Sequence, residues 1–247
     1  MPIKTLLLPG LDGTGKLLDH FAQAAPKHMS CEIIRYEKHL ATLDDFVAVA
    51  ASKLTTKTKT VIVAESFSGP IAAQLAFRFP ERIAAIVFAA SFVIPPNHNL
   101  LKLARFIPAN FFRNISSRGW LVKKFCLNDV RDKSIINEGI AVVASLEPDV
   151  IQRRLMMLSQ TAPSKTCVIP TLDLRAMRDR IVSLSSAASV AQVFVNATTV
   201  KIDAPHFLLL SRPEECWIAI EKFLAGLSLR EQRQMPRTSH HLSSQKK

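Results

Sequence analysis

The feature that most constrains the fold is a regular alternation of short apolar runs, rich in β-formers, with longer helical patterns. In the helical patterns, apolar residues recur every three or four positions. Strands that alternate with helices build a parallel sheet covered by helices. The predicted strands are residues 4–8, 31–36, 61–64, 83–88, 168–174 and 198–202. The predicted helices are residues 17–25, 43–54, 71–79, 184–192 and 213–224. We therefore expect an α/β fold with a mostly parallel six-stranded sheet flanked by helices.

The alternation is interrupted between residues 93 and 165, where no strand is predicted. Helical patterns there cover residues 100–106, 135–145 and 150–158. A long helical insertion after a parallel strand lies over the carboxyl edge of the sheet, where open α/β folds bind ligands. We therefore expect a core of residues 1–92 and 166–228, a helical cap of residues 93–165, and a basic tail of residues 229–247. The tail lacks an apolar period, so it is predicted to be disordered.

The charge balance is strongly basic, at +12 over 247 residues, and the tail contributes +4 of it. A basic chain attracts nucleic acids, anionic membranes or anionic substrates. No nucleic-acid-binding motif accompanies the charge, so we expect no nucleic-acid partner and interpret most of the basic residues as a solvated surface.

The cysteines and the amino terminus carry no targeting or metal-binding signal. Four widely spaced cysteines without metal-ligand spacing are expected to be reduced and structural, and no metal site is predicted. The first apolar run is cut off by Pro9 and Gly10, which leaves it too short for a signal peptide or a membrane span. A cytoplasmic location is therefore expected.

The most informative segment is residues 61–71, a buried strand that runs directly into a helix through small residues. A nucleophilic serine needs an exposed oxygen above the sheet, which requires a strained strand-to-helix turn with small neighbours. Ser66 occupies such a turn, and its neighbours Ala64, Ser68 and Gly69 are small. Ala64 and Ser68 replace both glycines of the usual Gly-x-Ser-x-Gly pattern. An ordinary serine-rich turn, or Ser68 as the nucleophile, remains an alternative.

Asp179 and His206 each follow a predicted strand and precede a predicted helix. Because the carboxyl ends of parallel strands share one edge, both loops should open on the same side as Ser66. Asp173 competes with Asp179 but lies within a strand, and we interpret it as structural. A lone loop histidine would also be interpreted as structural. Together, the three residues predict that His206 removes the proton of Ser66 while Asp179 fixes the histidine tautomer.

A glycine-rich loop, Pro-Gly-Leu-Asp-Gly-Thr-Gly at residues 9–15, follows the first strand. The backbone N–H groups of Leu11 and Phe67 are predicted to form an oxyanion hole, and Gly10 permits a close approach. The alternative is a phosphate-binding loop. However, the glycine spacing does not match Gly-x-Gly-x-x-Gly, and no P-loop lysine follows. Asp12 is interpreted as a turn-former with Gly13.

These motifs resemble those of a known superfamily. With Glu-Ser-Phe-Ser-Gly at residues 65–69, Arg-Asp-Arg at 178–180 and Ala-Pro-His-Phe at 204–207, the chain resembles the α/β-hydrolases. The resemblance is to small bacterial serine esterase/lipase/thioesterase-like hydrolases and to the hydrolase portion of plant esterase/lipase/thioesterase proteins. It covers about residues 3–224 and includes the cap only by position and length.

The resemblance implies an α/β-hydrolase fold without the first two strands of larger members, and an acyl-serine intermediate formed without metal or organic cofactor. The chain order Ser, Asp, His is that of these enzymes. Pro9 stands where many relatives have a histidine that braces the oxyanion loop, which bears on rate more than on reaction type.

Three functions follow as hypotheses: hydrolysis of a carboxylic ester or thioester, acyl transfer to an alcohol by the same acyl-enzyme, and ligand binding without catalysis. The cap offers one indication of the substrate, since residues 93–128 contain no acidic side chain. Its basic residues, which alternate with large apolar ones, are Lys102, Arg105, Arg113, Arg118, Lys123 and Lys124. Such a lid suits an acyl chain on an anionic carrier, or peripheral contact with a membrane. The alternative is an amphipathic cap with a solvated outer face.

Overall fold

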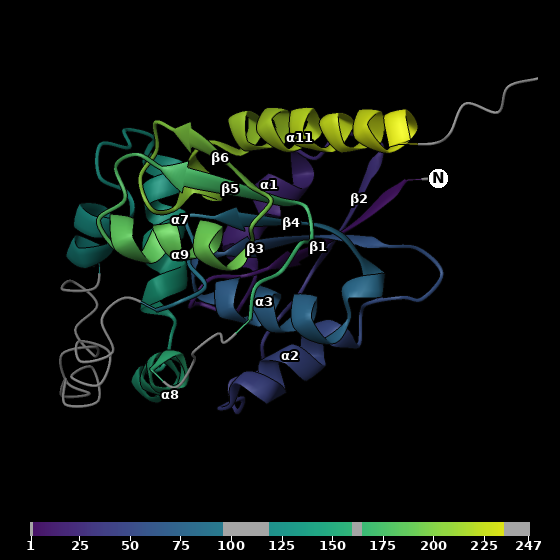
Figure 1. The fold of residues 1–247 in the computed structure, drawn as a ribbon. Coiled ribbons are helices and arrows are strands. Elements are labelled where there is room, and N and C mark those ends of the chain that lie inside the picture. The colour runs from purple at the N-terminus through teal and green to yellow at the C-terminus, as the bar shows by residue number, and fades with distance from the viewer. Residues whose placement is uncertain (1, 96–118, 160–164, 235–247) are drawn as a thin grey trace, which may run out of the picture.

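The computed structural model describes residues 2–95, 119–159 and 165–234 (Figure 1). A six-stranded sheet, parallel throughout, has the order β2-β1-β3-β4-β5-β6. The strands are β1 (Ile3–Leu8), β2 (Met29–Ile33), β3 (Thr60–Glu65), β4 (Ile83–Ala89), β5 (Thr171–Ala176) and β6 (Ala197–Ile202). The predicted parallel six-stranded sheet is confirmed. The predicted strand 168–174 begins later, at Thr171, because Pro170 has no N–H for the ladder, although its carbonyl accepts from the Ile86 N–H.

Helices cover both faces of the sheet, as expected. They are α1 (Asp19–Gln23), α2 (Leu43–Ala51), α3 (Gly69–Arg78), α9 (Leu184–Val193), α10 (Leu208–Ser211) and α11 (Pro213–Gln234). Residues of α1 and α11 pack on one face of the sheet, and residues of α2, α3 and α9 pack on the other (Figure 1). Helix α2 begins with a capping box, in which Thr42 and Asp45 exchange side-chain to backbone hydrogen bonds.

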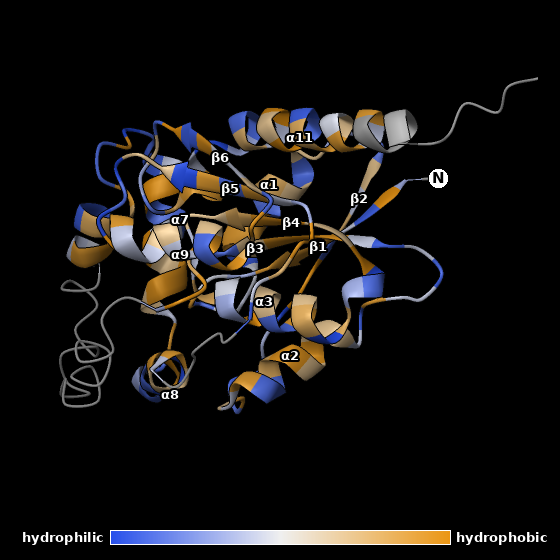
Figure 2. Ribbon diagram, in the orientation of Figure 1, coloured by the Kyte–Doolittle hydropathy of each residue, from blue (hydrophilic) through white to orange (hydrophobic). Residues whose placement is uncertain are grey.

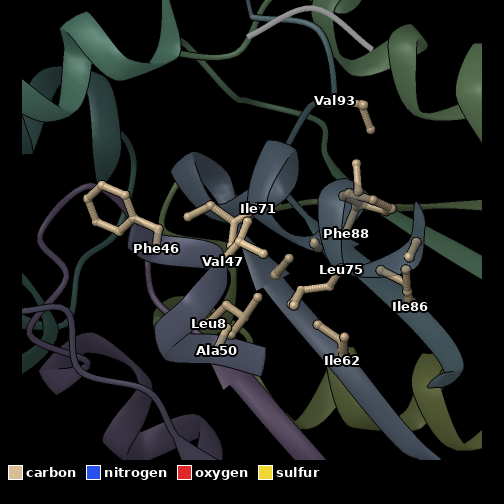
Figure 3. Close-up of a cluster of buried hydrophobic side chains, with 14 of the residues drawn as sticks. Leu8, Phe46, Val47, Ala50, Ile62, Ile71, Leu75, Ile86, Phe88 and Val93 are labelled. Carbon is tan, nitrogen blue, oxygen red and sulfur yellow. The ribbon is translucent and has the colours of Figure 1, made fainter. Parts of the chain in front are cut away.

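The central strands β3 and β4 are buried on both faces, so their residues are apolar except for Thr60 and Glu65 at the two ends of β3 (Figure 2). Successive side chains of β1 alternate between two clusters. Leu8 joins Phe46 of α2 and Ile71 of α3 (Figure 3), whereas Leu7 faces α1 and α11. On that second face the rings of Phe21 and Trp217 stack with centroids 4.4 Å apart, and the Trp217 indole N–H donates to the Phe21 carbonyl at 2.7 Å.

The described part of the insertion lies at the carboxyl edge of the sheet (Figure 1). It contains a π-helical segment, Val122–Cys126, and two helices, α7 (Lys133–Ala144) and α8 (Pro148–Leu158). The helices predicted at 135–145 and 150–158 are therefore present. The helix predicted at 100–106 lies outside the described residues, and the domain bounds remain predictions.

The carboxyl end differs from the prediction of a tail that begins at residue 229. Helix α11 continues to Gln234, because residues 227–234 are mostly Leu, Arg, Glu and Gln, which have high helix propensity. The remainder of the predicted tail, residues 235–247, lies outside the described residues. Among the helices that the structure describes, α11 included, none combines the length and apolar character needed to cross a bilayer.

Candidate active site

The turn between β3 and α3 holds Ser66 in an unusual backbone conformation. The turn is a single 3₁₀ turn, Ser66–Ser68, and the φ angle of Ser66 is +44°, in the left-handed region that non-glycine residues rarely adopt. The Ser91 hydroxyl, just beyond β4, donates to the Ser66 carbonyl at 2.6 Å and helps hold this conformation. A strained turn of this kind is what a nucleophilic serine requires.

The glycine that this turn needs is Gly69. A Cβ atom at position 69 would overlap the Phe92 carbonyl oxygen and the Ser91 hydroxyl, so no other residue fits without a backbone shift. Ala64 lies within the sheet, paired with Leu8 and Phe88, where a small side chain suffices. The close backbone approach therefore falls one residue later than in the Gly-x-Ser-x-Gly pattern, which explains why Ser68 is tolerated.

Ser68, the alternative nucleophile, is completely buried. Its hydroxyl donates to the Pro9 carbonyl and lies 3.1 Å from the Tyr36 hydroxyl. These contacts tie the Ser66 turn to the glycine-rich loop and leave Ser68 without a histidine partner. The structure thus gives Ser68 a bracing position.

Ser66, His206 and Asp179 form a continuous hydrogen-bonded chain. The distance from Ser66 Oγ to His206 Nε2 is 2.9 Å, and that from His206 Nδ1 to Asp179 Oδ2 is 2.8 Å. The other Asp179 oxygen, Oδ1, accepts the backbone N–H groups of Ile181 and Val182 at 2.7 and 2.9 Å. Only 6% of the His206 side chain and 8% of the Asp179 side chain are exposed. This arrangement meets the geometric requirements for a nucleophile, a base and a group that orients the base.

Asp173, the alternative acid, lies in β5, and its hydrogen-bond partners are Arg175 and Thr199. Its side chain is 1% exposed. Its Oδ2 accepts hydrogen bonds from Arg175 Nε at 2.6 Å and from Thr199 Oγ1 at 3.4 Å. Burial raises the pKa of Asp173 above its ordinary value, and the hydrogen bond from Arg175 opposes that change. Its contacts are those of a structural residue, as expected from its place within a strand.

The loop of residues 9–15 leaves β1 and lies beside Ser66. The Gly13 N–H donates to the Gly10 carbonyl at 3.1 Å, and Asp12 Oδ2 accepts both the N–H and the hydroxyl of Thr14, at 2.8 and 2.6 Å. Asp12 is thus a turn-former, as predicted. Because a trans peptide directs its N–H opposite to its carbonyl, the Leu11 N–H points away from Gly13. It donates to no group among the described residues, so it is available to a ligand.

Ser66 and His206 border an apolar cavity of about 360 Å³, and Leu11 and Phe67 also line it. The cap and its neighbours contribute most of the wall, including Leu17, Leu121, Phe125, Val143, Leu155 and Leu158. The polar residues of the lining include Asp12, Glu65, Ser66 and His206, and the last two are hydrogen-bonded to each other. A largely apolar cavity bordered by a serine and a histidine suits an acyl chain that ends in a reactive carbonyl.

Sequence analysis did not identify two buried charged residues near this site, Glu65 and Arg154. The sequence shows Glu65 only as part of the 65–69 motif and Arg154 only as part of a helical pattern, whereas each contacts the loop of residues 9–15 through tertiary hydrogen bonds. Glu65 Oε2 accepts the Gly10 N–H at 3.2 Å, while Oε1 has no hydrogen-bond partner among the described residues. Burial, with a smaller contribution from the charge of Asp12, raises the pKa of Glu65 to about 7.

The raised pKa of Glu65 predicts a specific dependence of stability on pH. The folded state holds the Glu65 proton more tightly than the unfolded state, so the free energy of unfolding falls as pH rises from 4.5 to about 7. The glutamine side chain of Glu65→Gln carries no charge at any pH in this range, so the variant should not show this fall in the free energy of unfolding. The test is urea unfolding between about pH 4 and 8. The free energy of unfolding of the variant, minus that of the wild type, should rise across that window by up to about 1.4 kcal/mol per pH unit. The exposed Glu81→Gln is the control, and a Glu65→Gln difference that stays constant with pH would contradict the prediction.

Only part of the predicted basic cap lies within the described residues. Lys123 and Lys124 are exposed on the π-helical segment, and Lys124 Nζ lies 4.5 Å from the ring centroid of Trp120, which is itself exposed. Arg180, in the loop that carries Asp179, donates to the Lys124 carbonyl at 3.2 Å. The remaining basic residues, which lie outside the described residues, are Lys102, Arg105, Arg113 and Arg118.

All four cysteines lie in the described part of the chain and are unpaired. Burial raises the pKa of the Cys31 thiol to about 11 and that of Cys126, which lines the cavity, to about 12. Thiols with such pKa values are poor nucleophiles at neutral pH. Within residues 2–95, 119–159 and 165–234, no group of three or more His, Cys, Asp or Glu side chains is arranged to hold a metal ion.

Comparisons with known proteins agree with this architecture. A family model described as "alpha/beta hydrolase fold" matches residues 18–118. An esterase from Thermogutta terrifontis superimposes with a TM-score of 0.75 at 17% identity, over 92% of this chain and 91% of that one. An enol-lactonase from Burkholderia xenovorans gives 0.75 at 14% identity, over 91% and 92%.

A putative non-heme bromoperoxidase from Mycobacterium tuberculosis gives a TM-score of 0.75 at 18% identity, over 92% of this chain and 93% of that one. No curated protein matches the sequence significantly. The family model and the structural similarities confirm the α/β-hydrolase fold that the sequence predicts. At these identities the structural similarity bears on the fold and not on the substrate.

Proposed function

We propose that this protein, which has the α/β-hydrolase fold, is a serine hydrolase that cleaves carboxylic esters or thioesters through an acyl-serine intermediate. The observation that carries the proposal is the unbroken chain of hydrogen bonds from Ser66 through His206 to Asp179, of which Ser66 and His206 line an apolar cavity. Esters and lactones are also the substrates that two of the structural neighbours are named for.

In the acylation step, His206 Nε2 takes the proton of Ser66 as Oγ attacks the substrate carbonyl carbon, and the carbonyl electron pair moves to oxygen. The tetrahedral intermediate collapses when the leaving group departs with the proton from His206. Water, activated in the same way, then releases the acid and restores Ser66. The two backbone N–H groups on Asp179 Oδ1 keep its Oδ2 directed at Nδ1, which holds the imidazole in the tautomer that can accept the serine proton.

The negative charge on the substrate oxygen requires preorganised donors. The Leu11 N–H is available on one side. The Phe67 N–H lies in the first turn of a helical segment, where backbone donors have no intrahelical partner. Both residues line the cavity beside Ser66, and we assign the oxyanion hole to them. The positive end of the α3 dipole adds to their effect.

The acyl group is proposed to occupy the apolar part of the cavity, and the exposed Lys123 and Lys124 to attract an anionic leaving group such as coenzyme A. Two substrate series test this: 4-nitrophenyl esters and acyl-coenzyme A thioesters of increasing chain length, each at low and high salt. We expect kcat/KM to rise with chain length until the cavity is filled. For the thioesters it should fall with added salt, because charge attraction is screened over about 10 Å at 0.1 M ionic strength. For the neutral esters it should barely change.

A pair of double variants controls for the cap. Lys123→Glu with Lys124→Glu should reproduce the effect of salt on the thioesters, through the encounter rate. Lys57→Glu with Lys59→Glu reverses two exposed lysines before β3, at the opposite edge of the sheet, and should have no such effect. Equal salt responses in the two series would rule out recognition of an anionic carrier, and no turnover in either series would rule out the proposed hydrolysis.

A further inference from the structure

Helix α8 of the cap carries a buried arginine. Arg154 is only 2% exposed, although arginine is rarely buried unless its charge is paired or hydrogen-bonded. Its neighbours on the helix, Ile151, Leu155 and Leu158, line the cavity. The same face of α8 thus provides both apolar wall and a buried cation.

The guanidinium group of Arg154 binds the glycine-rich loop directly. Nη1 donates to the carbonyls of Leu11 and Asp12 at 2.7 and 2.6 Å, and Nη2 donates to the Tyr36 carbonyl at 3.3 Å. Gly13 makes room for the group, since a Cβ there would lie 2.5 Å from Nη1, and its φ of +63° also favours glycine. The loop and the guanidinium group therefore fit each other closely.

Every backbone carbonyl from Gly10 to Gly13 accepts a hydrogen bond. The Gly10 carbonyl accepts from Gly13 and the Gly13 carbonyl accepts from the Tyr36 N–H at 2.8 Å. Among the described residues, Arg154 alone supplies the donors for the two carbonyls between them. Without the guanidinium group, the carbonyls of Leu11 and Asp12, in the two peptides that follow the Leu11 N–H, would lose these donors. Buried carbonyls are rarely left without a donor, so the orientation of these two peptides should depend on Arg154.

We propose that Arg154 is a positioning residue for catalysis, which holds the glycine-rich loop from the cap so that the Leu11 N–H meets the developing oxyanion. The inference rests on the proposed hydrolase function. A displacement of about 1 Å in a catalytic group costs up to about 100-fold in rate, and loss of one oxyanion donor costs about 100- to 1,000-fold in kcat. A donor that is displaced but not removed should cause a loss of rate at the lower end of this range. Because α8 also forms the cavity wall, one helix controls both acyl binding and oxyanion stabilisation.

The test compares Arg154→Met and Arg154→Lys with Arg153→Met. Arg153 is the adjacent residue on the same helix, and its Nη2 also donates to a backbone carbonyl, that of Lys38 at 2.9 Å, but it does not touch the loop. Three quantities are measured: kcat and KM for the best ester, the affinity for an alkylboronic acid, which forms a tetrahedral adduct with serine, and the affinity for the alcohol of the same chain length.

For Arg154→Met we expect kcat to fall about 10- to 100-fold, in line with the cost of a misplaced catalytic group. Boronic acid affinity should fall in parallel, while KM and alcohol affinity change little. Arg154→Lys, which can donate to one carbonyl, should recover part of the loss, and Arg153→Met should resemble the wild type. A merely structural role would not separate boronic acid from alcohol in this way.

The possible outcomes distinguish this inference from the proposed function. Circular dichroism and thermal unfolding establish which variants fold, and Arg154→Lys serves if Arg154→Met does not. With wild-type hydrolysis intact, three outcomes would overturn the positioning role. These are an unchanged kcat in a folded Arg154 variant, equal losses of affinity for the boronic acid and the alcohol, and failure of both Arg154 variants to fold. A wild type that cleaves no ester and does not react with a fluorophosphonate would instead overturn the proposed function, and this inference with it.

Discussion

Ser66→Ala is expected to lower kcat by about six orders of magnitude, the size of loss found when the nucleophile of a serine protease is removed. The change removes the attacking oxygen but little volume, and the contact between His206 and Asp179 does not depend on it. The fold should therefore remain, with thermal unfolding within a few degrees of the wild type. Steady-state kinetics measures the loss, and mass spectrometry after fluorophosphonate treatment should find the label on Ser66 in the wild type and no label in the variant.

Ser68→Ala is the matched control, since it removes a hydroxyl two residues away in the same turn. Ser68 is buried and bonded to the Pro9 carbonyl, so its loss should cost about 1–3 kcal/mol of stability with a much smaller effect on kcat. If Ser68→Ala were inactive and Ser66→Ala retained turnover, the nucleophile would be Ser68.

Asp179→Asn is expected to lower kcat about 10,000-fold, as the equivalent change does in a serine protease. The structure provides the reason. The backbone N–H groups of Ile181 and Val182 need an acceptor, so the asparagine oxygen should face them and its NH₂ group should face His206. Nδ1 must then accept a hydrogen bond, which places the ring proton on Nε2. In this tautomer His206 cannot take the proton of Ser66.

Asp173→Asn separates this effect from simple loss of a buried carboxylate. Asp173 is paired with Arg175 at 2.6 Å, and breaking a buried pair typically costs about 3–5 kcal/mol, so urea unfolding should reveal a less stable protein. Its kcat should remain within a few-fold of the wild type. The reverse pattern, with an inactive but folded Asp173→Asn and an active Asp179→Asn, would exchange the two roles.

The sequence predicted that Ser66, Asp179 and His206 lie together because each of them follows its own parallel strand. Ser66 follows β3, Asp179 follows β5 and His206 follows β6, and the carboxyl ends of parallel strands meet at one edge. Local order along the chain was therefore enough to bring together three residues that are far apart in sequence.

The contacts that hold the site could not be predicted in the same way. The partner of Arg154 is a loop more than 140 positions earlier in the chain, and an arginine in a helical pattern ordinarily indicates a solvated face. Gly69 was recognised as small, but the need for glycine comes from the Phe92 backbone, which follows another strand. Helix α11 exceeded its predicted end because intrinsic propensity sustained it where the apolar period stopped.

The stacked rings of Phe21 and Trp217 also bear on how the protein folds during its synthesis. Their contact spans 196 residues, so the apolar face of α1 has no permanent cover until α11 has been made. At about 5–20 residues per second, that face stays uncovered on the ribosome for roughly 10–40 s. Until α11 is made, the nascent chain therefore exposes this apolar face to aggregation and to chaperones.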